Sequence, residues 1–189
     1  MEWRGRLEEQ LGVYTVELAD ATAARVLDDE LSLAGVNALA SLLQVLPERD
    51  PHPQLYEAAV LCLRAAGHPS FTVSIIRFEL RLLDELGFGL LLSKCAVTGG
   101  TEDLAYVSPK SGQAVMREAA GPYIDKLLPL PAFLSGGGDG GEGRPTTSDA
   151  LAALSLTGYF LGRHVFDDIS RPLPRAREEF KRILGRKGI

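Results

Sequence analysis

The fold is decided by the stretch Cys95-Ala-Val-Thr-Gly-Gly-Thr-Glu-Asp-Leu-Ala-Tyr-Val-Ser-Pro-Lys-Ser-Gly-Gln-Ala-Val-Met116. It predicts a turn, a short strand, a tight turn and a second short strand. Zinc knuckles share this outline, but they bind the ion through four Cys or His side chains. Here only Cys95 is a good ligand, because Thr98, Met116 and Ala119 stand where the others would be. We therefore expect residues 93–119 to form a degenerate, metal-free knuckle-like β-hairpin.

Long apolar segments flank this hairpin and repeat at helical spacing. The strongest carries Phe71, Ile75, Phe78 and Leu82 on one stripe and stops at Gly87. Further helices are expected at 21–46, 53–66, 122–128, 147–166 and 174–186. The fold class is therefore mainly α, a helical bundle with the hairpin inserted between its helices.

Two other segments lie outside the bundle. Residues 12–18 alternate between apolar and polar side chains and predict a strand. We expect no partner strand close to it in sequence, so it resembles the last strand of a sheet. Residues 135–145 are rich in glycine and predict a flexible loop. This loop has no Gly-Lys-Ser/Thr ending and stops at Pro145, which disfavours a phosphate-binding role.

Charge is distributed unevenly along the 189 residues, whose net charge is −5. Residues 163–189 contain eight Lys or Arg and four Asp or Glu, a net charge of +4, which leaves −9 on the rest. A basic segment on an acidic body favours an anionic partner such as nucleic acid or an acidic peptide. The alternative is a solvated helix end, where Lys and Arg are common.

Cellular location is constrained by the cysteine content and by the lengths of the apolar runs. Two cysteines, Cys62 and Cys95, make no disulfide framework, so a reducing cytoplasm is the simplest compartment. No apolar run approaches the ~18 residues that a membrane-spanning helix needs. Cys62 lies within an apolar helix and is expected in the core.

The residues form no recognisable catalytic constellation, so we expect no enzyme. None of the three histidines has a partner ligand at helical spacing. Glu79 lies on the apolar side of its helix and is either a carboxylate paired with a donor, which we favour, or a catalytic acid of a hydrolase. Arg77 and Arg81, on the polar face of that helix, form either a solvated stripe or a cationic anchor for an acidic peptide.

Several short motifs then occur in a characteristic order. They are Arg77-Phe-Glu-Leu80, Leu86-Gly-Phe-Gly89, Cys95-Ala-Val-Thr-Gly99, Tyr106-Val-Ser-Pro109, Ser170-Arg-Pro-Leu173 and Arg175-Ala-Arg-Glu178. Together the motifs make the chain similar to the RecO family of bacterial DNA repair proteins, from about residue 3 to residue 186. The segment 77–109 is the most specific part of this resemblance.

The resemblance implies an architecture and a function. The family has an N-terminal OB-fold, a helical domain and, in many members, a four-cysteine zinc knuckle. Residues 1–20 would then be a remnant of the OB-fold, and residues 21–189 the helical domain. The family mediates recombination in the RecF pathway: it binds single- and double-stranded DNA and the acidic C-terminal tail of single-stranded DNA-binding protein (SSB), and with RecR it helps load RecA. This implies a cytoplasmic, nucleoid-associated protein that has no membrane partner, needs no cofactor and is not an enzyme.

The resemblance also suggests which residues bind these partners. Phosphate contacts are expected on the basic C-terminal helix, at Arg171, Arg175, Arg177, Lys181 and Arg182. Arg77 and Arg81 are expected to hold the SSB tail, and no metal site is expected, Cys95 being a lone remnant. The alternative is a helical protein-interaction adaptor that does not bind DNA.

Overall fold

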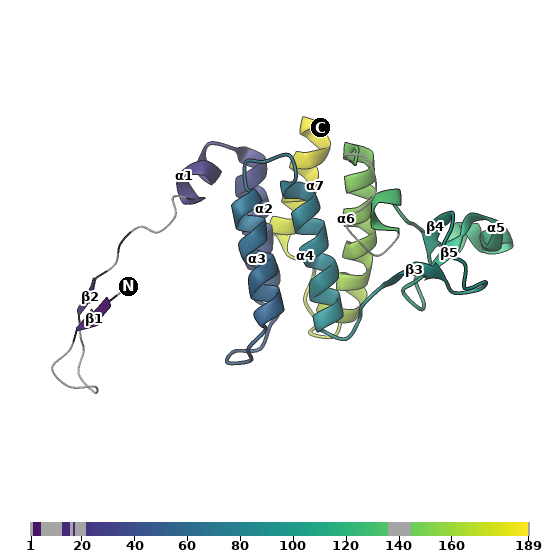
Figure 1. Ribbon diagram of the computed structural model, residues 1–189, viewed down its shortest axis with the longest axis horizontal. Helices are drawn as coiled ribbons and strands as arrows, with labels where there is room; N and C mark the ends of the chain where they lie inside the picture. The colour runs from purple at the N-terminus through teal and green to yellow at the C-terminus, as the bar shows by residue number, and fades with distance from the viewer. Residues whose placement is uncertain (1, 5–12, 16, 18–21, 136–144, 189) are drawn as a thin grey trace.

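A computed structural model describes residues 2–4, 13–15, 17, 22–135 and 145–188. It is mainly helical, with one small sheet inserted in the middle of the chain (Figure 1). The principal helices are α2 (Glu30–Leu43), α3 (Pro53–Ala65), α4 (Phe71–Glu85), α6 (Thr147–Leu161) and α7 (Arg175–Lys187). They stand side by side, while the sheet projects from one side of the bundle, beyond α6. The predicted fold class is confirmed.

Local sequence signals set the ends of these helices. The Asp29 side chain accepts a hydrogen bond from the Ser32 N–H at 2.9 Å and caps α2. Pro53 is the first residue of α3, where its missing N–H costs nothing. Thr146 and Asp149 form a reciprocal capping box at the start of α6. Gly87, with a φ of 85°, follows the end of α4 and reverses the chain.

The core lies where α4 meets the helices around it. The predicted stripe of α4 is confirmed, because Phe71, Ile75, Phe78 and Leu82 are all buried. Phe71 packs edge-to-face against Phe180 of α7, with ring centroids 6.2 Å apart. The other large apolar side chains of α7 in the core are Ile183 and Leu184.

The inserted sheet has four strands in the order β3-β5-β4-β6. Its strands are β3 (Leu91–Cys95), β4 (Leu104–Val107), β5 (Gln113–Met116) and β6 (Leu128–Pro129). The expected hairpin is the antiparallel pair β4–β5; β3 runs parallel to β5, and β6 pairs antiparallel with β4. Leu104 and Val115 are buried and Tyr106 is half-buried, so apolar packing supports the hairpin.

Two of the predicted helices differ from the structure. The expected helix 21–46 is two helices, α1 (Thr22–Leu27) and α2, because the Asp29 cap begins a new helix. Residues 122–128 were expected to be helical; after the short α5 (Arg117–Ala120) the chain instead forms a 3-10 helix at Gly121–Lys126, and Leu128 enters β6.

The N-terminal strand has a partner, contrary to expectation. It is β2 (Val13–Thr15), and it pairs antiparallel with β1 (Glu2–Arg4), with Glu2 opposite Thr15. The predicted glycine-rich loop falls largely on residues 136–144, which lie outside the described residues. Division of the chain into segments 1–20 and 21–189 stays a prediction. Among the described residues, no helix combines the length and the apolar character needed to cross a membrane.

Candidate partner-binding surfaces

The knuckle-like segment is held together by hydrogen bonds among the positions where a zinc knuckle would carry its ligands. Cys95 is buried, and its Sγ accepts a hydrogen bond from the Met116 N–H at 3.4 Å. The Thr98 hydroxyl donates to the Met116 sulfur at 3.0 Å and accepts from the Gly100 N–H at 3.2 Å. The two arms of the segment are therefore joined by side chains that stand where zinc ligands would.

Hydrogen bonding also shifts the pKa of the Cys95 thiol. Burial acts to raise this pKa, but the nearby Thr98 hydroxyl and the backbone N–H groups of Met116, Thr98 and Val97 outweigh it and lower the pKa to about 7. No group of three or more His, Cys, Asp or Glu that could hold a metal occurs in the part of the chain that the structure describes. One thiolate with a threonine, a thioether and an alanine does not fit a zinc ion, which takes four Cys or His ligands in such sites.

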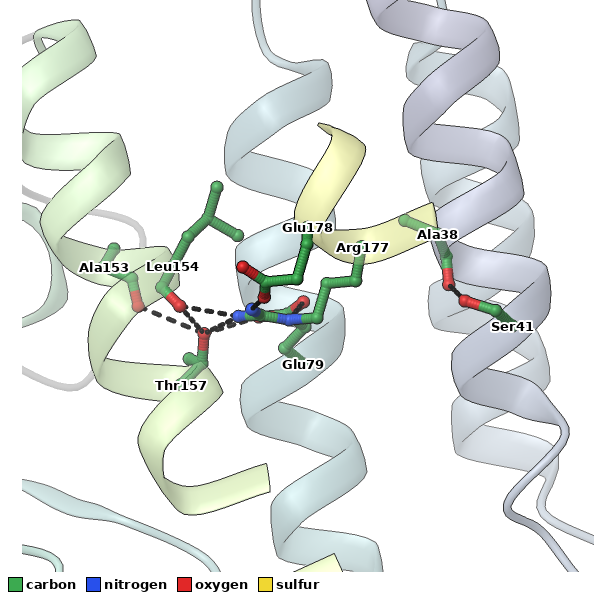
Figure 2. Close-up of polar contacts among 8 residues, drawn as sticks. All are labelled: Ala38, Ser41, Glu79, Ala153, Leu154, Thr157, Arg177 and Glu178. Carbon is green, nitrogen blue, oxygen red and sulfur yellow. Dashed lines mark hydrogen bonds and ion pairs between the residues drawn. The ribbon is translucent and has the colours of Figure 1, made fainter. Parts of the chain in front are cut away.

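A buried ion pair joins three helices at the centre of the bundle (Figure 2). Arg177 of α7 donates to both carboxylate oxygens of Glu79 on α4, at 2.7 Å from Nε and 2.9 Å from Nη2. Its Nη2 also donates to the Leu154 carbonyl oxygen at 2.6 Å and to the Thr157 hydroxyl at 3.2 Å, both on α6. The Thr157 hydroxyl donates in turn to Glu79. We call Arg177, Glu79 and Thr157 the clamp.

The clamp is closed to solvent and fully partnered. The exposed fraction of the side chain is 1% for Arg177 and 0% for Glu79. Burial acts to lower the pKa of Arg177, but the charges and hydrogen bonds of Glu79 and Glu178 outweigh it and raise the pKa, so the guanidinium stays cationic. Gly158 makes room for it, because a Cβ at that position would lie 2.7 Å from Arg177 Nη1.

The clamp decides two predictions. The preferred interpretation of Glu79, a structural carboxylate paired with a donor, is confirmed; the catalytic alternative is wrong, since no substrate can reach the carboxylate. Arg177 as a DNA contact is also wrong, because its guanidinium is buried and occupied by Glu79. Sequence alone gave little warning, since Arg177 lies on a helix with many exposed cations.

Most other cations of α7 are paired within the molecule. Arg182 pairs with Glu179 on the same helix, and Arg186 and Lys187 pair with Glu30 and Asp29 at the start of α2. In the described ranges, no carboxylate forms an ion pair with Arg171, Arg175 or Lys181. Arg171 and Arg175 are exposed and Lys181 is half-buried. Among the described residues, the cations of this segment without an acidic partner therefore include Arg171 before α7, Arg175 at its start and Lys181 in its middle.

A groove between α3 and α4 brings Arg77 and Arg81 together with Arg64, a cation that sequence reasoning missed. It encloses about 650 Å³. The side chains that line it include Leu61, Cys62, Arg64, His68, Arg77, Phe78 and Arg81. Leu61 is 61% exposed, while Cys62 is buried and burial raises its thiol pKa to about 12. Arg81 donates to Gln54 at 2.8 Å across the groove.

The groove combines an apolar floor with a rim of one charge sign. Its lining residues include three arginines and no carboxylate. Such a surface suits a short peptide that carries both acidic and apolar side chains. The signal that the sequence offered was the helical spacing of Leu61, Arg64 and Ala65, which places them on one face of α3 toward α4.

Comparison with known proteins identifies the family. The model named "Recombination protein O C terminal" matches residues 27–172. The chain is a member of the RecO family. It is 49% identical to the DNA repair protein RecO of Chelativorans sp. (strain BNC1), over 95% of this chain and 72% of that protein. It is 47% identical to that of Methylocella silvestris, over 94% of this chain and 71% of that protein. It is 44% identical to the DNA repair protein RecO of Cereibacter sphaeroides (strain ATCC 17029 / ATH 2.4.9), over 98% of this chain and 76% of that protein.

Membership of the RecO family implies a role in DNA repair and recombination as a mediator that is not an enzyme. The matched segment includes the α3–α4 groove, the knuckle-like sheet and Arg171, but it ends before α7. No solved structure matches the chain.

Proposed function

We propose that this chain is a recombination mediator of the RecF pathway that binds the acidic C-terminal tail of SSB in the α3–α4 groove. The observation that carries this proposal is the cationic rim of that groove above an apolar floor. The carboxylates of an acidic tail would meet Arg64, Arg77 and Arg81, and its aromatic end would cover Leu61. In this proposal the protein works in the cytoplasm, at the nucleoid, with RecR, and helps to load RecA onto single-stranded DNA.

DNA binding is the second part of the proposal. Arg171, Arg175, Lys181 and Arg182 would bind phosphates, with no preference for base sequence. Arg171 and Arg175 carry most of this role, because they are exposed and, within the described part of the chain, have no acidic partner. Arg182 would first have to leave Glu179, which holds it in an exposed pair at 2.6 Å.

The tail-binding part is tested with a fluorescent acidic peptide that ends in an aromatic residue. In a fluorescence anisotropy titration, Arg81→Ala and Arg77→Ala should each weaken binding about 10-fold or more, because each removes a charge-assisted hydrogen bond worth about 1.5–3 kcal/mol. Arg117→Ala is the matched control, because its exposed side chain pairs with Asp103 beside the sheet. Equal affinities for all variants would refute the groove as the tail site.

DNA binding is tested by the dependence of affinity on salt. Reversing both charges in Arg171→Glu/Arg175→Glu should lower single-strand affinity and reduce the slope of log K against log salt by about 0.7 for each phosphate that the variant no longer neutralises. An unchanged slope would contradict the assignment. Tail binding by a chain with no DNA affinity would favour a protein-interaction adaptor, a role consistent with the internal pairing of most α7 cations.

A further inference from the structure

Two sequence motifs that contribute no residue to the α3–α4 groove or to α7 lie together at one hollow on the surface. Residues 87–90 follow α4, and residues 110–112 form the turn between β4 and β5. Together with Phe160 of α6 and His164, which follows that helix, they line a hollow of about 190 Å³. The two motifs are those that the sequence gives as Leu86-Gly-Phe-Gly89 and as the tight turn at 108–112. We call this hollow the slot.

Three rings are stacked along one wall of the slot. The Phe160 and His164 rings are inclined by 10°, with centroids 6.1 Å apart, and those of His164 and Phe88 by 21°, with centroids 5.0 Å apart. The stack runs from the core to the surface, because Phe160 is 2% exposed whereas Phe88 is 39% exposed. The outermost ring of an ordered stack is thus open to solvent.

The chain is shaped to hold this stack. His164 lies in a π-helical turn, Gly162–Phe166, closed by a hydrogen bond from the Asp167 N–H to the Gly162 carbonyl oxygen at 2.8 Å. Turns of this kind interrupt helices frequently at functional sites. Gly112 of the β4–β5 turn has a φ of 68°, and a Cβ there would lie 3.0 Å from Leu90 and 3.8 Å from Phe160. The turn therefore packs closely against the residues that line the slot.

Lys110 is the one cation among the described residues that line the slot, and the exposed Asp84 carboxylate lies against Gly89 at its edge. Lys110 and Ser111 line it and are exposed, and no carboxylate is among its lining residues. Arg163, next to His164 in the π-helical turn, is also exposed and donates to the Tyr159 hydroxyl at 2.9 Å. A ligand at the slot would thus meet a flat apolar ring, the Lys110 ammonium group and the Ser111 hydroxyl.

We propose that the slot takes one base of single-stranded DNA, stacked on Phe88, with Lys110 and Ser111 binding the adjoining phosphate. This assignment rests on the proposed DNA binding and adds to it a contact with a base. The slot is smaller than the ~300–1,000 Å³ of small-molecule sites, which suits one planar group and not a whole ligand. Aromatic platforms flanked by cations are how proteins hold single strands without reading sequence, because every base has a π face.

The test separates base contacts from backbone contacts. Two labelled oligonucleotides of the same length are titrated, one of thymidines and one of abasic nucleotides, and affinity is measured by anisotropy. Phe88→Ala should weaken binding of the thymidine strand about 5- to 150-fold and leave the abasic strand unchanged. Phe88→Trp should retain affinity. Tyr123→Ala removes another exposed aromatic ring, outside the slot, and should change neither affinity.

Each other outcome overturns a defined claim. If Phe88→Ala weakened both strands equally, or neither, the slot would hold no base. If the parent chain bound neither strand, the DNA-binding part of the proposed function would fall, and the slot with it. Circular dichroism of each variant checks that the fold is intact.

Discussion

Replacement of Arg177 by methionine tests the energetic role of the clamp. The change removes a guanidinium that makes hydrogen bonds to Glu79, Leu154 and Thr157. It leaves the Glu79 carboxylate, whose side chain is 0% exposed, with the Thr157 hydroxyl but no counter-charge. Because a buried charge that loses its partner costs about 3–5 kcal/mol, Arg177→Met should lower the free energy of unfolding by that amount.

The assay is urea unfolding followed by far-UV circular dichroism. With a slope of about 2 kcal/mol per molar urea, the expected loss moves the midpoint down by about 1.5–2.5 M. Arg175→Met is the matched control, because that side chain is exposed two residues earlier on α7 and should leave the midpoint almost unchanged.

A double variant separates the pair from its individual charges. In Glu79→Leu/Arg177→Met no charge is stranded, so most of the lost stability should return, as for other buried pairs replaced by apolar groups. The reasoning would be refuted if Arg177→Met cost no more than Arg175→Met, or if the double variant were less stable than Arg177→Met alone.

Three further predictions concern positions elsewhere in the bundle and sheet. Gly158→Ala should lower stability by about 1–3 kcal/mol in thermal unfolding, because its methyl group meets a guanidinium nitrogen at 2.7 Å, whereas Gly162→Ala has no neighbour nearer than 3.8 Å and should not. Asp29→Ala should cost about 1 kcal/mol. Hydrogen bonds from Ser32 and Lys187 lower the Asp29 pKa from 3.8 to about 2, so this cost should be constant above about pH 5 and vanish as pH falls toward 2; a cost that stayed constant down to pH 2 would contradict the assignment. Cys95→Ser should leave the fold nearly intact, and metal analysis of the parent chain should find no stoichiometric zinc.

Periodic apolar patterns and turn residues predicted the bundle well, because both signals are local. The stripe of α4 and the hairpin of β4 and β5 needed only spacing and turn chemistry. The division of the first long helix was missed because an unbroken run of leucines masked the capping signal at Asp29. The strands β3 and β6 are short, and they are strands because of partners distant in sequence, which local patterns do not show.

The candidate sites also depend on contacts between residues that are distant in sequence, which local patterns do not show. Arg175 and Arg177 look alike in the sequence, yet one is exposed and the other is the best-buried cation described in the core. What separates them is Glu79, 98 residues earlier, and the space left by Gly158. The slot likewise unites motifs whose spacing along the chain gives no hint that Phe88 and His164 stack.

The order of synthesis gives the clamp one more consequence. Glu79 emerges from the ribosome 98 residues before Arg177, and Glu30 emerges 156 residues before Arg186. Because translation adds about 5–20 residues per second, Glu79 of α4 is without the Arg177 guanidinium for about 5–20 s. During that interval α2 and α4 lack the helix that covers them, so the nascent bundle has an open apolar seam with an unpaired acid in it. A chaperone that binds the growing chain would find that seam before the fold has closed.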